Sequence, residues 1–149
     1  MSRTWVLGGG GARGAAQVGM LLALFEAGIE PPARLVGASV GALNASLIAA
    51  HPSLAGAQML RQVWFSKVAR DVFRIHPVTS LLAGVRRQLN TLPSTNVLRL
   101  IVSTERLTGI TTFEQLRRPL QVVATDLEAG VPQVFDSGRL TPALLESRS

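Results

Sequence analysis

The chain has 149 residues, of which 47% are hydrophobic, and it carries a formal net charge of +6. This composition excludes disorder, and the absence of cysteine excludes disulfides and thiolate metal sites. The 15 basic residues are scattered and tyrosine is absent, so we expect no nucleic-acid surface built on stacked aromatic rings. We expect one domain over residues 1–149, with no metal and no cofactor.

The first fifty residues predict alternating strands and helices. Short apolar runs predict strands at residues 4–7 and 34–37. Longer apolar stretches predict helices at residues 15–27, closed by Gly28, and at residues 40–50. This order is typical of parallel strands in a layered α/β sheet.

The rest of the chain predicts a helical middle followed by a hairpin. Strands are expected at residues 120–125 and 131–135, joined by a turn, and a last helix begins at Thr141. A helix at 96–107 is expected to be capped by Thr95 or Asn96. The other expected helical segments are 54–68, 79–89 and the single turn 112–116. The fold class is therefore α/β, a three-layer α/β/α arrangement with a mostly parallel central sheet.

A serine stands between two glycines where the second strand meets the second helix. Gly37, Ser39 and Gly41 form a G-x-S-x-G pattern with an apolar strand before it and an apolar helix after it. Glycines at both flanks let the chain reverse sharply and leave the serine hydroxyl accessible. The pattern predicts a nucleophilic serine at Ser39, with a helix-capping serine as the alternative.

Four adjacent glycines, Gly8–Gly11, follow the first strand. Residues 9–14 also fit the G-x-G-x-x-G fingerprint of dinucleotide-binding domains. Dinucleotide binding requires an acidic residue at the end of the second strand to hold the ribose. Glu30 lies instead before Pro31-Pro32 in the preceding loop, which disfavours this function. Consecutive glycine amides can instead converge on an anion. Beside Ser39 they would form an oxyanion hole for an acyl intermediate.

With these two motifs the sequence resembles the patatin-like phospholipase family, most of all its bacterial members. The resemblance rests on residues 9–14 and 37–41 with the linking helix, and continues less specifically through 122–127 and 134–138. It implies a Ser–Asp dyad hydrolase of lipid acyl esters that needs no metal. By this match Ser39 is the nucleophile. The match also implies an oxyanion hole from the amides of Gly9, Gly10 and Gly11, and supporting roles for Arg13, Gly14, Gly37 and Gly41.

The chain departs from the family pattern in its general base. The family's catalytic aspartate stands in an Asp-Gly pair, and this sequence contains no such pair. We therefore expect an N-terminal portion of a patatin-like domain, incomplete at its C-terminal end, with an open sheet edge and an uncovered apolar face. Asp126 is a weak candidate for the base, because a turn aspartate explains it as well. His51 follows Ser39 by twelve residues, about 18 Å along a helix, which is out of reach.

Three functions remain open from the sequence. The first is a serine acyl-ester hydrolase acting on lipid or phospholipid, with activity impaired in this chain. The second is a non-catalytic fragment that binds lipid or protein, and the third is a dinucleotide-binding domain. We expect a cytoplasmic protein with peripheral membrane contact, since no apolar stretch reaches the length of a membrane span.

Overall fold

The computed structural model describes residues 3–72, 94–126 and 129–147. Within these residues, four strands form one sheet in the order β1-β2-β3-β4. Strands β1 (Thr4–Leu7), β2 (Arg34–Ala38) and β3 (Leu120–Asp126) are parallel, and β4 (Val131–Phe135) pairs antiparallel with β3. The mostly parallel α/β sheet and the hairpin are confirmed.

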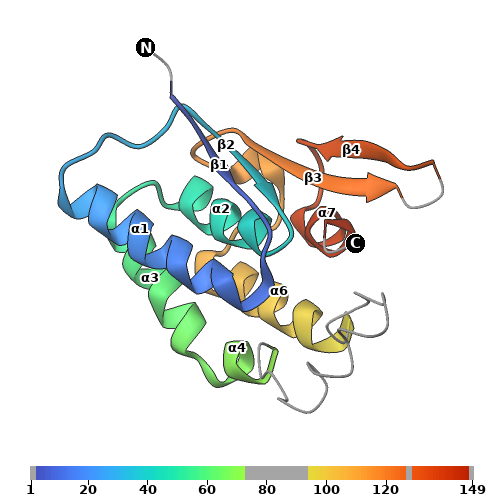
Figure 1. Cartoon of the computed structure of the whole chain (residues 1–149), viewed down its shortest axis with the longest axis horizontal. Coiled ribbons are helices and arrows are strands. Elements are labelled where there is room, and N and C mark those ends of the chain that lie inside the picture. The colour runs from blue at the N-terminus through green and yellow to red at the C-terminus, as the bar shows by residue number, and fades with distance from the viewer. Residues whose placement is uncertain (1–2, 73–93, 127–128, 148–149) are drawn as a thin grey trace.

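The described helices lie on one face of this sheet (Figure 1). Helix α2 (Val40–Ala50) packs on β1, β2 and β3, and α7 (Leu140–Glu146) packs on β3. Helices α1 (Gly14–Glu26), α3 (Leu54–Phe65) and α6 (Ser94–Thr108) pack against α2 in turn. All residues of α2 are buried, which explains why its sequence is apolar on every side.

The opposite face of the sheet is open in the described residues. Side chains alternate along a strand, so Leu35 and Val122 face α2 while Val6 and Val134 face the other way. Leu35 and Val122 are fully buried, whereas Val6 is 71% and Val134 53% exposed. This is the uncovered apolar face that the sequence predicts, and no described helix forms a third layer over it.

Element boundaries agree closely with the sequence, with two exceptions. The predicted helix 54–68 is two helices, α3 and α4 (Lys67–Val72), separated at Ser66, whose extended backbone ends α3. Helix α6 begins at Ser94, so the predicted caps Thr95 and Asn96 are wrong and lie within the helix. The predicted turn near 112–116 is a 3-10 helix, Phe113–Gln115. The predicted helix 79–89 lies outside the described residues.

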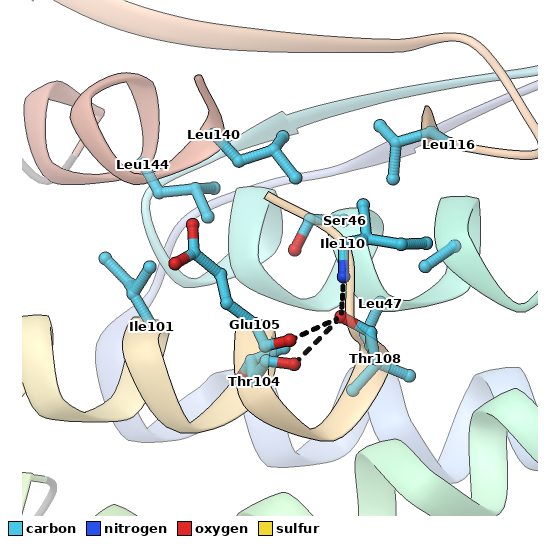
Figure 2. A pocket seen from close by; sticks show the side chains of 11 residues that line it. Ser46, Leu47, Ile101, Thr104, Glu105, Thr108, Ile110, Leu116, Leu140 and Leu144 are labelled. Atoms are coloured by element: carbon cyan, nitrogen blue, oxygen red, sulfur yellow. Dashed lines mark hydrogen bonds between the residues drawn. The ribbon is translucent and has the colours of Figure 1, made fainter. Parts of the chain in front are cut away.

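Helices α2, α6 and α7 enclose a cavity of about 10 Å³, room for a single water molecule (Figure 2). Its walls are mainly leucine and isoleucine side chains. Glu105 reaches from α6 toward α7, where its carboxylate accepts a hydrogen bond from the Thr141 hydroxyl. The cavity is too small for an organic ligand, so it belongs to the core and not to a binding site.

Candidate active site

The register of β1 and β2 brings the two glycine-framed motifs together. The strands are parallel and Leu7 pairs with Gly37, so both strands end at the same level. The glycine loop after Leu7 and the turn at Ser39 therefore leave the same edge of the sheet. Ligands of parallel α/β sheets bind at this carboxyl edge. The juxtaposition expected from the sequence is present.

Ser39 occupies the sharp turn between β2 and α2. Its φ is 53° and its ψ −129°, and it is the one non-glycine residue of the described chain with positive φ. Ser39 stands at the N-cap position of α2, yet its side chain makes no capping hydrogen bond. Its hydroxyl is therefore not used as a helix cap. A strained serine at a strand-to-helix turn is typical of the nucleophile of α/β serine hydrolases.

Close backbone packing explains both glycines that flank the serine. A Cβ on Gly37 would lie 2.5 Å from the Ala42 Cα, and a Cβ on Gly41 only 2.0 Å from the carbonyl oxygen of Leu7. Real Cβ atoms do not approach backbone so closely. The first turn of α2 therefore lies directly against the end of β1, which any larger residue would prevent.

Gly14 lets the start of α1 approach the same turn. A Cβ on Gly14 would lie 2.7 Å from Val40, the residue after Ser39, and 2.8 Å from the ring of Trp64. Helix α1 therefore begins beside α2, and the N-termini of both helices lie at the edge that carries Ser39. The positive ends of helix dipoles favour negative charge developing there.

The glycine loop lies against the serine through Gly9. A Cβ built on Gly9 would come within 3.2 Å of the Ser39 Cβ and 3.9 Å of its Oγ. Gly10 and Gly11 have φ values of 151° and 57°, which glycine adopts most easily. Nothing lies within 4 Å of a Cβ built on Gly11, so the loop is open there.

Three polar side chains that the motifs do not include support the loop. The Gln17 amide nitrogen donates to the Gly8 carbonyl at 2.7 Å, and the Asn44 amide donates to Gln17 Oε1 at 2.8 Å and to the Gly14 carbonyl at 3.1 Å. The Trp64 indole nitrogen donates to Asn44 Oδ1 at 2.9 Å. Asn44 is fully buried. In the sequence, the one hint of this network is Asn44, a lone asparagine within an otherwise apolar helix.

Arg13 follows the glycine run by two residues. It ends the 3-10 helix Gly11–Arg13, its backbone N–H donates to the Gly10 carbonyl at 3.1 Å, and its side chain is exposed. A Cβ built on Gly10 would lie 3.5 Å from the Arg13 Cβ, an ordinary packing distance. The backbone hydrogen bond from Arg13 to Gly10 therefore closes the loop, without use of the Arg13 guanidinium.

None of the acidic and histidine residues considered from the sequence is shown beside Ser39 in the described residues. Asp126 ends β3, is exposed, and accepts a hydrogen bond from the Ala129 backbone N–H at 3.0 Å, so it closes the hairpin turn. Asp136 follows β4 and is exposed. His51 lies at the C-cap of α2, the end opposite Ser39, and His76 lies outside the described residues. Glu30 is exposed in the loop before β2, away from the position of a ribose-binding acid.

The described residues offer neither a metal site nor a membrane span. They contain no cluster of three histidine, aspartate or glutamate side chains suited to a metal ion. No helix among them has the length and apolar character needed to cross a membrane.

Comparison with known proteins identifies the family. The model of the patatin-like phospholipase family matches residues 5–145. The chain is 33% identical over 139 residues to the neuropathy target esterase sws of Drosophila grimshawi and 32% identical to that of Drosophila melanogaster. These matches cover 91% of this chain but only 8% and 9% of the relatives. The chain belongs to the patatin-like phospholipase family, a family of lipid hydrolases.

Solved structures support the same fold. The type III effector protein ExoU matches 99% of this chain and 40% of its own, with a TM-score of 0.58 and 23% sequence identity. ExoU in complex with SpcU from Pseudomonas aeruginosa matches with a TM-score of 0.54 and 21% identity, over 99% of this chain and 38% of its own. The chain thus spans less than half of these relatives.

Proposed function

We propose that Ser39 is the nucleophile of a serine acyl-ester hydrolase acting on lipids. The observation that carries the proposal is the strained Ser39 backbone, with its side chain against Gly9 and free of any capping bond. In addition, the esterase relatives align with almost the whole chain. The proposal makes the amides of Gly9, Gly10 and Gly11 the oxyanion hole.

The proposed reaction proceeds through an acyl-enzyme. The Ser39 Oγ attacks the carbonyl carbon of the ester, and the glycine amides stabilise the oxyanion that forms. The ester C–O bond then breaks, the alcohol leaves with a proton, and water hydrolyses the acyl group from Ser39. The Ser39 proton needs a base, and the family's Asp-Gly pair is absent from these 149 residues. We therefore expect weak activity from this chain alone.

The test is hydrolysis of a p-nitrophenyl ester by the purified chain and by its Ser39→Ala variant. We expect slow hydrolysis that the variant loses, because Ser39 without a base is still a weak nucleophile held beside the glycine loop. Equal rates in both proteins would contradict the nucleophile and favour the alternative of a non-catalytic fragment. Fast hydrolysis that depends on Ser39 would mean that a residue of this chain accepts the Ser39 proton, and Asp126 would be the first candidate to mutate.

The proposal extends to contact with a lipid surface through α1 and α3. A groove of about 280 Å³ between these helices is lined mainly by apolar side chains. Phe65 is 70% exposed there, and Arg61 lies over its ring at 5.6 Å. Met20 of α1, outside the groove lining, is 59% exposed. Exposed apolar groups beside cations suit an anionic membrane surface. We propose a cytoplasmic protein that binds membranes peripherally through this face.

Co-sedimentation with vesicles of phosphatidylcholine and phosphatidylserine tests the membrane contact. We expect Phe65→Ser to weaken binding, whereas Val134→Ser, which also removes an exposed apolar side chain but on the sheet face, should bind as well as the unchanged protein. Equal binding by the unchanged chain and Phe65→Ser would contradict this assignment of the surface.

A further inference from the structure

We infer that Gln17 is a positioning residue that aims the backbone N–H of Gly9 toward the position of the oxyanion beside Ser39. The inference rests on the proposed function for its chemistry and on three hydrogen bonds for its geometry. It concerns a residue outside both glycine-framed motifs.

The hydrogen bonds that join Trp64, Asn44 and Gln17 fix which atom of each amide faces which partner. An indole N–H can only donate, so Trp64 requires the oxygen of the Asn44 amide to face it. The Asn44 nitrogen then faces Gln17 and Gly14, and requires the oxygen of the Gln17 amide to face Asn44. The Gln17 nitrogen is left to donate to the Gly8 carbonyl at 2.7 Å. Trp64 therefore determines the amide orientation of both residues.

The Gly8 carbonyl that Gln17 holds is coupled to the Gly9 amide. These two groups belong to one planar trans peptide, in which the C=O and the N–H point in opposite directions. A hydrogen bond that holds the Gly8 oxygen therefore also fixes the direction of the Gly9 N–H. Gly9 is the loop residue that lies against Ser39, since a Cβ built on Gly9 would be 3.2 Å from the Ser39 Cβ.

The glycine loop needs such a restraint. The glycine loop has no side chains of its own, and glycine backbones adopt many conformations at little cost. A peptide of this loop could rotate unless something holds it. Oxyanion donors act only when they are aimed before the reaction, and a displacement of 1 Å can lower the rate by about 10²-fold. Gln17 supplies the restraint from the first turn of α1.

Two variants at one position separate the hydrogen bond from simple packing. Gln17→Met keeps a side chain of similar length but cannot donate to the Gly8 carbonyl. Gln17→Glu has an ionised carboxylate at pH 7, which repels that carbonyl, but its protonated form at acid pH donates again. Gln17 is half-buried, so both variants should fold. Gln58→Glu, the same change at an exposed position of α3, is the matched control.

The readouts are the rate at which a fluorophosphonate labels Ser39 and the Gly9 amide resonance in ¹H–¹⁵N spectra. In the labelling step the Ser39 Oγ bonds to phosphorus, fluoride leaves, and the hydroxyl proton passes to solvent. We expect Gln17→Met to label roughly 10- to 100-fold more slowly than the unchanged chain at every pH. Gln17→Glu should be as slow at pH 7 and regain much of the rate, relative to the unchanged chain, as its carboxyl protonates. Gln58→Glu should be unaffected.

A Gly9 resonance and a labelling rate that Gln17→Met leaves unchanged would overturn the inference. If the unchanged chain takes no label at Ser39, the proposed function fails, and the Gly9 resonance then decides the positioning role by itself. In that case a shifted or broadened Gly9 resonance in Gln17→Met, with the resonances of the remote Gly109 and Gly130 unmoved, supports the role.

Discussion

Gly9 lies so close to Ser39 that a Cβ on the glycine would stand 3.2 Å from the Cβ of the serine. The contact joins the loop after β1 to the turn after β2, two segments that are thirty residues apart in the sequence. It explains why the loop carries no side chains at this point. It also places the backbone of Gly9 beside the Ser39 side chain.

The backbone of Gly10 gives a first prediction. Its φ of 151° is a conformation that a β-branched residue cannot easily adopt, so Gly10→Val should rearrange the loop without unfolding the sheet. We expect the Ser39-dependent hydrolysis rate to fall by roughly 10²- to 10³-fold, the typical cost of one oxyanion donor. Circular dichroism should remain unchanged. A variant with full activity would contradict the role of the loop.

The strain at Ser39 gives a second prediction. Positive φ costs a residue with a Cβ about 1–3 kcal/mol, and glycine avoids most of that cost. We therefore expect Ser39→Gly to be more stable to urea than Ser39→Ala by about 1 kcal/mol, after the greater chain entropy of glycine is included. Both variants should lack hydrolysis. If Ser39→Ala were the more stable protein, the turn would not be strained as described.

The packing at Gly41 gives a third prediction about the fold itself. A methyl group there would lie 2.0 Å from the Leu7 carbonyl oxygen, so Gly41→Ala must separate α2 from β1. We expect a loss of about 3 kcal/mol or more in the free energy of unfolding. Gly19→Ala is the control, because a Cβ at Gly19 meets nothing within 4 Å and alanine favours the helix. Equal thermal stability of the two variants would be inconsistent with the close packing.

A carboxylate far from the serine predicts a dependence of stability on pH. The Glu114 carboxylate accepts a hydrogen bond from the Gly138 N–H at 2.8 Å, and this bond lowers the pKa of Glu114 below its ordinary value of 4.5. A lowered pKa in the folded state means that the stabilisation is present above pH 4.5 and is lost as the pH falls through the lowered pKa. Glu114→Gln should therefore melt at a slightly lower temperature than the unchanged chain at pH 7. The difference in melting temperature should vanish in acid. A difference that grows in acid would contradict a lowered pKa of Glu114 in the folded state.

Local sequence patterns predicted most of the fold near the site. The strands 4–7 and 131–135 and the helix 40–50 have the boundaries that apolar runs and glycines indicated. Ser39 and Gly9 were expected at one sheet edge because parallel strands end together. The break at Ser66 was missed, because the apolar spacing of the helix continues across it and does not report the extended backbone there.

The network behind the loop could not be predicted from the sequence. Gln17, Asn44 and Trp64 come from three different helices, and no spacing rule joins them. Their roles depend on how closely α1 and α3 approach α2, which Gly14 permits. The sequence also left the role of Asp126 undecided, because its residue type and position suit both a general base and a turn. Its hydrogen bond to Ala129 shows the turn.

The most direct measurement of the central claim is the site of fluorophosphonate labelling, found by peptide mass spectrometry on the folded and the urea-unfolded chain. An activated serine needs the folded turn and the glycine loop, whereas an ordinary serine reacts no faster when folded. We predict that Ser39 takes the label in the folded chain well before any other serine, and that the preference disappears on unfolding. Labelling of the folded chain that is absent from Ser39, or equal at Ser39 and at an exposed serine such as Ser103, would contradict the account.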